Sequence, residues 1–240
     1  MESSKVLQLF SGGKDSFLST CKLLEEDNTV FLATFENGCG LCCENVRHGV
    51  DRLTEKYGKE RVVFLGIYNI SGIWREFFIP FFNQKPSEIL EKYGEITFSQ
   101  FNCLTCRVSM YIYSMALCKN LGIRKISDGA RHDQGFVIEL EPMLERFKRL
   151  LNDYELELLL PVLDMNSDWK RKNELLIHGF VPKTLEPQCL LGVPLKEGKQ
   201  PDDDTIQGTI AFFDKEILNR CSSLIKKLEK VIREGGSEPI

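Results

Sequence analysis

Residues 5–16 read KVLQLFSGGKDS, and this stretch decides the fold. Its first six residues are mostly apolar and predict a short buried strand, while Gly12 and Gly13 predict a tight turn. Apolar residues at helical spacing come directly after the turn: Phe17, Leu18, Cys21 and Leu24. A strand, a glycine turn and a helix together begin a βα unit.

The same alternation recurs along the chain. Further strands are predicted over residues 30–35, 61–68, 125–127 and 156–161. Helices are predicted over residues 45–57, 86–93, 103–121, 136–151, 168–179 and 213–233. Strands alternating with helices favour an α/β fold with a doubly wound, mainly parallel sheet. We expect a catalytic domain over residues 1–200 and a C-terminal helical extension over residues 201–240.

The composition is that of an ordinary globular protein of 240 residues, with 42% hydrophobic and 28% charged residues. Its 31 Lys and Arg against 35 Asp and Glu give a net charge of −4, which disfavours a general polyanion-coating role. No stretch reaches the roughly 18 to 20 apolar residues of a membrane span, and the start lacks the apolar core of a signal peptide. The sequence therefore predicts a cytoplasmic protein without a membrane partner.

Ser11-Gly12-Gly13-Lys14-Asp15-Ser16 lies between the first strand and the first helix, where backbone N–H groups and the helix dipole can bind an anion. The two hydroxyls can donate to phosphate oxygens, Lys14 supplies positive charge, and Asp15 can hold a magnesium ion. The alternative is a plain glycine turn with a serine N-cap. The spacing is not that of a Walker A loop.

These six residues match in order the SGGxDS signature of the PP-loop ATP pyrophosphatases, which the sequence therefore resembles. The resemblance implies an adenine nucleotide α-hydrolase-like fold that cleaves ATP between its α and β phosphates. AMP is transferred to a substrate oxygen and is then displaced by a nucleophile. It also implies an ATP site with catalytic Lys14 and Asp15 and with adenine beside Ala33-Thr34-Phe35. Residues 127–134 form the loop expected to close this site, and its Asp128-Gly129 start agrees with the family.

The chain has nine cysteines, which is an odd number, and it is too long to need disulfides for stability. Several of the cysteines form close pairs, and in a reducing compartment such pairs indicate metal or redox chemistry. Cys103 and Cys106 form a C-x-x-C pair at the start of a predicted helix, where the dipole would stabilise their thiolates. Cys189 follows far along the chain, and it can join them only if the fold brings it back.

A C-x-x-C pair followed by one late cysteine resembles the arrangement in iron–sulfur tRNA thiolation enzymes, and the match of motif order extends over roughly residues 5–192. The resemblance implies that Cys103, Cys106 and Cys189 hold a [4Fe–4S] cluster. It also implies that one iron, without a protein ligand, accepts sulfur from a donor, and that tRNA is the acceptor. The expected enzyme adenylates a carbonyl oxygen and replaces it with sulfur.

Other interpretations of the cysteines stay open. Cys103 and Cys106 could form a disulfide that works with a persulfide on Cys189. Cys39 and Cys42 could instead complete a closed zinc site with Cys103 and Cys106. The sequence does not place the segment with Cys39, Cys42 and Cys43 in the thiolation pattern. Buried apolar thiols are expected at Cys21, Cys118 and Cys221.

Two alternative functions are also consistent with the sequence. The acidic balance and the lack of a recognisable RNA-binding module favour ATP chemistry on a small molecule, by sulfur insertion or by amidation of the deazaguanine-nitrile type. A nucleotide-sensing or metal-binding module without turnover is the other.

Residues 74–82 are rich in aromatics and predict core or a homodimer contact. Solvated charges are expected at Arg146, Lys148, Arg149, Lys170, Arg171 and Lys172.

Overall fold

The computed structural model describes residues 4–41, 43–181, 188–192 and 200–234. At its centre lies a five-stranded sheet in the order β4-β2-β1-β5-β6, and every neighbouring pair is parallel. The strands are β1 Lys5–Leu9, β2 Thr29–Glu36, β4 Val62–Asn69, β5 Lys125–Ser127 and β6 Glu157–Leu159. The predicted α/β fold with a doubly wound parallel sheet is confirmed.

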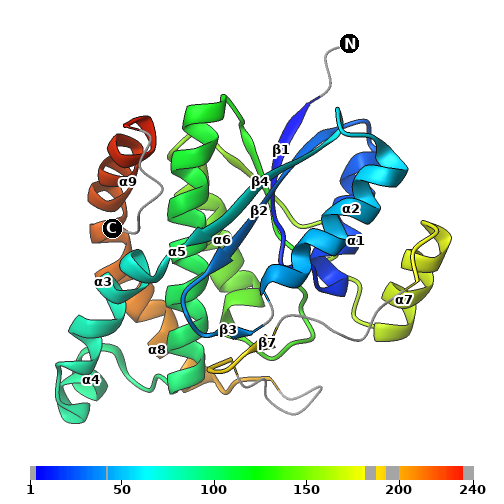
Figure 1. The fold of residues 1–240 in the computed structure, drawn as a ribbon. Coiled ribbons are helices and arrows are strands. Elements are labelled where there is room, and N and C mark those ends of the chain that lie inside the picture. Colours follow the sequence, from blue (N-terminus) through cyan, green and yellow to red (C-terminus); the bar gives the residue numbers. More distant parts are fainter. Residues whose placement is uncertain (1–3, 42, 182–187, 193–199, 235–240) are drawn as a thin grey trace.

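Helices cover both faces of the sheet (Figure 1). Helices α1 and α2 lie on one face with α7 beside them, while α5, α6 and α9 lie on the other. The helices are α1 Lys14–Glu25, α2 Val46–Tyr57, α3 Ser71–Phe82, α4 Pro86–Tyr93, α5 Phe98–Leu121, α6 Glu141–Asn152, α7 Asp168–Ile177, α8 Asp203–Phe212 and α9 Leu218–Arg233. A two-stranded antiparallel pair, β3 Gly40–Leu41 with β7 Gln188–Cys189, lies below the carboxyl ends of the sheet (Figure 1).

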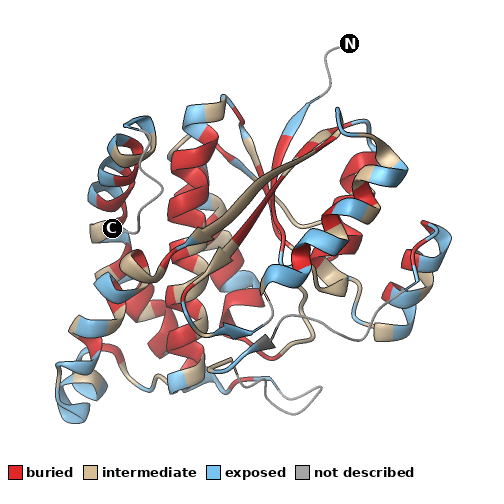
Figure 2. Cartoon of the chain, viewed as in Figure 1, coloured by how far each residue is buried: buried red, intermediate tan, exposed pale blue. Residues whose placement is uncertain are grey.

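Alternation along β1 divides the core into two layers. Val6 packs with the α1 and α2 side, whereas Leu7 packs with the α5 side, as side chains of a strand alternate between faces. Figure 2 shows the result, with buried residues along β1 and on the inner faces of the helices, while the edge strand β4 is mostly of intermediate exposure. Both faces of β1 are therefore buried, as a parallel sheet requires.

Three predicted helices have different bounds in the structure. The helix predicted to begin at Cys103 begins at Phe98, because the Thr97 side chain caps it by accepting from the Gln100 N–H. The helix predicted over residues 136–151 is divided into a 3₁₀ turn, Val137–Glu139, and α6, because Pro142 favours a new helix start. The helix predicted over residues 213–233 continues backwards through a π-helical turn, Phe213–Ile217, into α8.

The residues after position 200 cover the α5 face of the sheet. Phe212, Phe213 and Ile225 are buried in the same core as Tyr111 of α5. The division of the chain at residue 200 stays a prediction, and the structure describes α8 and α9 as one cover over α5.

Most of the aromatic run 74–82 is part of the core. Phe81 of α3 is 6% exposed and stacks on Phe101 of α5, with ring centroids 3.9 Å apart, while the Phe212 ring meets it edge-on at 5.4 Å. The next residue, Phe82, is 49% exposed. The homodimer contact expected from this run stays a prediction.

Phe81→Ala should lower the free energy of unfolding by about 3–5 kcal/mol, because it removes a buried ring that the core cannot refill. Phe82→Ala removes the same ring from the adjacent, half-exposed position and should cost much less. Urea unfolding followed by circular dichroism compares the two variants. Equal losses would contradict the packing described for α3.

Candidate active site

The candidate site lies where the sheet changes winding direction. β1 pairs with β2 on one side and with β5 on the other, so the connections that leave β1 and β5 diverge at their carboxyl ends. Ligands of open parallel sheets bind in the crevice at this point. The loop after β1 is the predicted phosphate loop, and the loop after β5 begins with Asp128-Gly129.

The two loops approach each other so closely that only glycine fits at position 129. A Cβ atom on Gly129 would lie 2.8 Å from the backbone N of Ser16 and 3.0 Å from the carbonyl carbon of Asp15. Both contacts are to backbone, which cannot move aside without shifting the start of α1. Gly129 therefore sets the position of the phosphate loop relative to β5.

Hydrogen bonds within the loop hold its shape. The Ser11 Oγ accepts from the Gly13 N–H over 3.3 Å, and the Ser16 Oγ donates to the Gly13 carbonyl over 3.0 Å. The two hydroxyl oxygens lie 3.1 Å apart. Gly12 has φ +77°, a conformation that strongly favours glycine. These hydrogen bonds and the conformation of Gly12 together define the shape of the loop.

A cavity of about 300 Å³ lies between the two loops and the end of β2. It is lined by Leu9, Phe10, Ser11, Gly13, Lys14, Asp15, Ser16, Ala33, Phe35, Arg107, Met110, Asp128, Gly129, Gln134 and Glu139. Of the residues predicted for ATP, Gly12 and Thr34 are not among these. The Thr34 hydroxyl instead donates to the Phe10 carbonyl over 2.6 Å and fastens β2 to β1.

The Lys14 ammonium is held by an acidic side chain of α7. Its Nζ lies 2.7 Å from Asp168 Oδ1, and Lys172 Nζ lies 2.6 Å from Asp168 Oδ2. The hydrogen bonds from Lys14 and Lys172 lower the pKa of Asp168 to about 2. Asp168 is therefore ionised and forms an ion pair with Lys14 of the phosphate loop.

Two arginines face the carboxylate of Asp15. Arg131 Nε lies 2.9 Å from Oδ2, and Arg171 Nε lies 2.9 Å from Oδ1. The Arg171 side chain is only 4% exposed, so the expectation that it is a solvated surface charge is wrong; its buried position comes from the packing of α7 on α1. Arg131 belongs to the loop predicted to close the nucleotide site, whereas the sequence does not predict Arg171 there.

The carboxylates near the phosphate loop are of the kind that magnesium prefers, but they face cations. Asp15 faces both arginines, and Asp133 lies 3.1 Å from Arg131 and 3.5 Å from Arg171. Magnesium in nucleotide sites is held mainly by phosphate oxygens with one or two carboxylates. The side chains would therefore fit a magnesium ion only together with phosphate oxygens, and the predicted role of Asp15 as its ligand stays a prediction.

An ion pair closes the deep end of the cavity. Arg107 of α5 pairs with Asp128, and the Tyr111 hydroxyl donates to Asp128 Oδ2 over 2.8 Å. Asp128 is 5% exposed, and the Arg107 side chain is 18% exposed. This network joins the loop after β5 to the helix that carries Cys103 and Cys106.

Glu139 is the most buried carboxyl group of the cavity, with 1% exposure. With the Gln134 amide oriented to suit its neighbours, its nitrogen donates to Glu139 Oε1 over 3.2 Å and its oxygen accepts from Arg131 over 2.7 Å. Burial raises the pKa of Glu139 to about 8, against the attraction of Arg107. The sequence pattern had placed this residue inside a helix.

The two cysteines of α5 lie one helical turn apart, after the first turn of the helix. Because α5 begins at Phe98, the expected stabilisation of their thiolates by the helix N-terminus is wrong. Burial raises the pKa of Cys103, and the nearby thiolates of Cys106 and Cys189 would raise it further. Burial also raises the pKa of Cys106 to about 12. Without a ligand these side chains are thiols.

The fold brings Cys189 back to the α5 pair. A Cβ atom on Gly192 would lie 3.5 Å from Cys189 Sγ and 3.8 Å from Cys103 Sγ, so both sulfurs border the same point. All three cysteines are free thiols. The fold thus brings Cys189 into the neighbourhood of Cys103, and a joint ligand role for Cys103, Cys106 and Cys189 stays a prediction.

A fourth cysteine, Cys39, joins this group through β3 and β7. Its carbonyl accepts from the Leu190 N–H over 2.9 Å, and Gly40 pairs with Cys189. Asn37 links both sides, because its Nδ2 donates to Cys106 Sγ over 3.4 Å and its Oδ1 accepts from the Cys39 N–H over 2.9 Å. Cys42, the other residue of the alternative zinc site, lies outside the described residues.

Within residues 4–41, 43–181, 188–192 and 200–234, no three or more His, Cys, Asp or Glu side chains are arranged as a metal site. Thiols are the side chains that hold iron–sulfur clusters and zinc, so Cys103, Cys106 and Cys189 have the right chemistry, while their described positions are not those of a formed metal site. Nor does the described part contain a helix long and apolar enough to cross a membrane.

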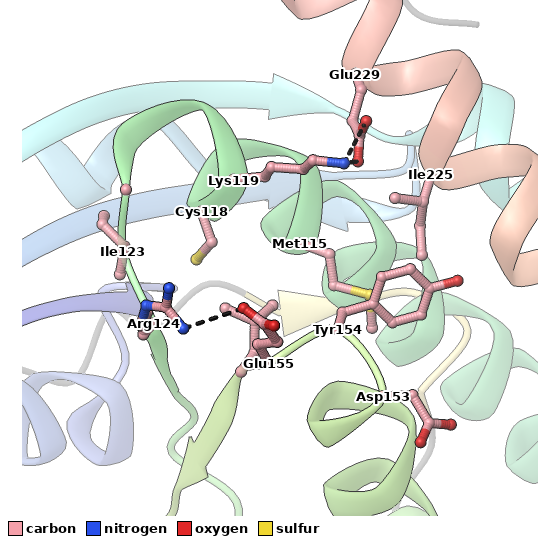
Figure 3. Close-up of a pocket in the computed structure, with 12 residues that line it drawn as sticks. Met115, Cys118, Lys119, Ile123, Arg124, Asp153, Tyr154, Glu155, Ile225 and Glu229 are labelled. Carbon is pink, nitrogen blue, oxygen red and sulfur yellow. Dashed lines mark hydrogen bonds and ion pairs between the residues drawn. The ribbon is translucent and has the colours of Figure 1, made fainter.

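A cavity of about 410 Å³ lies at the opposite, amino-terminal edge of the sheet (Figure 3). Its two basic side chains are both paired: Lys119 lies 2.8 Å from Glu229, and Arg124 lies 3.1 Å from Glu155. It contains none of the predicted site residues. We therefore assign the candidate site to the smaller cavity at the carboxyl edge.

Comparison with known proteins identifies the fold. A solved complex of a 4-thiouridine synthetase with RNA and bound ATP superimposes with a TM-score of 0.61 and 14% sequence identity over 95% of this chain. The matched region spans 53%, about half, of the length of that protein. The fold is thus the adenine nucleotide α-hydrolase-like fold that the SGGKDS motif predicts.

Two further structures match less well. The first is a predicted subunit of tRNA methyltransferase from Methanocaldococcus jannaschii, with a TM-score of 0.42, 13% identity and coverage of 82% of this chain and 100% of that one. The second is phosphoadenylyl-sulfate reductase from Candida auris, with a TM-score of 0.39, 14% identity and coverage of 73% of each chain. No protein-family profile and no curated protein matches the sequence.

Gly129→Ala should weaken ATP binding by about tenfold or more, because the added methyl group pushes against the backbone at Ser16 and costs about 1–3 kcal/mol. Equilibrium dialysis with labelled ATP measures the affinity. Gly122→Ala is the control, since its Cβ meets nothing within 4 Å and only its φ of +66° is strained. Unchanged affinity in Gly129→Ala would contradict the assignment of the cavity to ATP.

Asp168→Asn should strengthen ATP binding about two- to fivefold, because it removes an anion that competes with phosphate for Lys14 at the strength of a partly exposed ion pair. The same dialysis assay measures the change, and it should shrink at high salt. Asp164→Asn, at a side chain that is 92% exposed, controls for net charge. Weaker binding in Asp168→Asn would mean that Asp168 orients Lys14 for the nucleotide.

Proposed function

We propose that this protein is an ATP-dependent sulfurtransferase that adenylates a carbonyl oxygen of a tRNA base and replaces it with sulfur. One observation carries the proposal. Helix α5 places Arg107 and Met110 in the cavity of the phosphate loop and places Cys103 and Cys106 beside Cys189. A nucleotide site and a group of thiols therefore share one helix.

The phosphate loop would bind the triphosphate of ATP. The start of α1 presents backbone N–H groups to the cavity, and Lys14, Arg131 and Arg171 supply positive charge around it. Each of these cations now faces a carboxylate, which a phosphate group can replace. Ala33 and Phe35 line the part of the cavity nearest β2, where adenine would lie.

Adenylation turns a carbonyl oxygen into a good leaving group. The oxygen attacks the α-phosphorus, the bond from that phosphorus to the bridging oxygen breaks, and pyrophosphate leaves. Positive charge close to the phosphates stabilises the charge that develops on the leaving group. Sulfur then attacks the activated carbon, and AMP leaves.

Cys103, Cys106 and Cys189 would hold a [4Fe–4S] cluster in this proposal. A cluster with three protein ligands keeps one iron open, and when bound it supplies a place for a sulfur donor. Asn37 would orient Cys106 through its amide N–H, which favours the thiolate. Zinc held with Cys39 is the alternative that the same neighbourhood allows.

A small-molecule acceptor is the second candidate, and the net charge of −4 favours it. It keeps the ATP chemistry but needs no polyanion surface. The acceptor assay below separates the two candidates.

Protein purified without oxygen should contain about four iron and four sulfide per chain. With ATP, magnesium, hydrosulfide and bulk tRNA it should release AMP and pyrophosphate and form a thionucleoside that mass spectrometry detects. Cys103→Ala, Cys106→Ala and Cys189→Ala should abolish the thionucleoside, whereas Cys221→Ala, in the core, should not. Iron-free protein with bound zinc would contradict the cluster, and the lack of any thionucleoside would contradict the tRNA acceptor.

A further inference from the structure

The loop that carries Glu139 is held to α5 by two hydrogen bonds of the Gln100 side chain. Gln100 Oε1 accepts from the Val137 N–H over 2.8 Å, and Gln100 Nε2 donates to the Gly135 carbonyl over 3.1 Å. The His132 Nδ1 lies 2.9 Å from the Glu139 carbonyl oxygen. The backbone of residues 135–139 is thus held at three points, which fixes the position of the Glu139 main chain at the cavity.

The Glu139 carboxyl group lines the cavity, and one of its two oxygens makes no hydrogen bond within the described residues. Glu139 is 1% exposed, and its Oε2 has no hydrogen-bond partner among the residues that the structure describes. A buried oxygen without a partner costs about 1–3 kcal/mol or more, so a water molecule or a ligand group that donates to Oε2 from the cavity would be stabilising. Surface carboxylates nearby, such as Glu141, have no such constraint.

Glu139 is near both the phosphate loop and Cys103. It lines the same cavity as the phosphate loop, and its charge is near enough to Cys103 to affect the pKa of that thiol. The charged groups that face it are Arg107 from α5, Asp128 from the loop after β5, and Arg131. This is the place where an acceptor must lie if it is to reach both the α-phosphate and the sulfur.

We propose that Glu139 is the residue that takes a proton from the acceptor during adenylation. The inference rests on the proposed function and names the acceptor chemistry more closely: a lactam, in which an N–H group adjoins the carbonyl. Such an oxygen is a poor nucleophile until the N–H proton is removed, so a base at this position has a defined task.

The proton and electron balance closes in two half-reactions. In the first, the Glu139 carboxylate takes the N–H proton, the carbonyl oxygen bonds to the α-phosphorus, and pyrophosphate leaves with the electrons of the broken P–O bond. In the second, hydrosulfide adds to the carbon and AMP leaves. The Glu139 carboxyl returns its proton to the ring nitrogen, the S–H proton is lost to water, and a thiolactam remains.

The nearly neutral pKa of Glu139, about 8, suits this task. Because burial raises this pKa above the value of an unfolded chain, the folded protein holds a proton that the unfolded chain has lost. The native state should therefore lose stability as the pH rises from about 4.5 to about 8. This effect gives a measurement that is independent of turnover.

The experiment compares Glu139→Gln with Glu141→Gln, the same change on the exposed first residue of α6. With ATP and bulk tRNA but without hydrosulfide, pyrophosphate release reports adenylation alone. Glu139→Gln should lower its rate at least 100-fold with an ATP affinity within twofold of the unmodified protein, while Glu141→Gln should match the unmodified protein. Glu139→Asp should keep part of the rate.

Two pH series complete the test. In the unmodified protein the adenylation rate should rise with pH as the Glu139 carboxylate forms, and the residual rate of Glu139→Gln should lose this limb. As the pH rises from 5 to 8, the urea concentration at the unfolding midpoint should decrease more in the unmodified protein than in Glu139→Gln.

The outcomes separate this inference from the proposed function. Full adenylation by Glu139→Gln, or an unchanged pH limb, would overturn the role of Glu139 and leave the function intact. No pyrophosphate release by the unmodified protein with tRNA would overturn both. A lost rate together with weakened ATP binding would mean a structural role and would also overturn the inference.

Discussion

The close approach of Gly129 to the backbone at Ser16 is the constraint on which the site depends. It joins the loop after β1 to the loop after β5 without any side chain between them. The cavity exists because these two loops meet at the carboxyl edge of the sheet, where the winding direction changes. The hydrogen bonds of Ser11 and Ser16 then fix the phosphate loop in that position.

Helix α5 connects the chemistry on either side of this junction. Its buried length packs against the sheet, the aromatic residues of α3 and the C-terminal helices, so its orientation is well determined. The same helix carries Cys103 and Cys106 on one turn and Arg107 towards the cavity. Any chemistry that couples the nucleotide to the thiols must therefore work across a distance fixed by one rigid element.

The local pattern of the sequence is sufficient for the five strands of the main sheet and for the phosphate loop, but it does not predict β3 and β7. Alternation and glycine turns act over a few residues, and the βα unit at residues 5–25 follows from them. The helix start at Phe98 was missed because a single capping side chain, Thr97, decides it. The 3₁₀ turn before α6 was missed because its apolar residues also fit a helical period.

The rest of the site comes from long-range packing that no local pattern contains. Arg171 reads as a surface charge, yet α7 buries it beside Asp15. Asn37 and Cys39 reach Cys106 and Cys189 only through the pairing of β3 with β7. The Pro142 signal in the sequence could have divided the predicted helix and so drawn attention to Glu139.

The pairing of the phosphate-loop cations with acidic side chains has one more consequence. Lys14 lies against Asp168, and both arginines lie against Asp15, so an incoming anion must exchange with carboxylates rather than fill an electropositive hole. A singly charged ion gains little from such an exchange, whereas a polyphosphate can replace several partners at once. On the proposed function, these ion pairs would therefore favour ligands that carry several negative charges along their length over ions with a single charge.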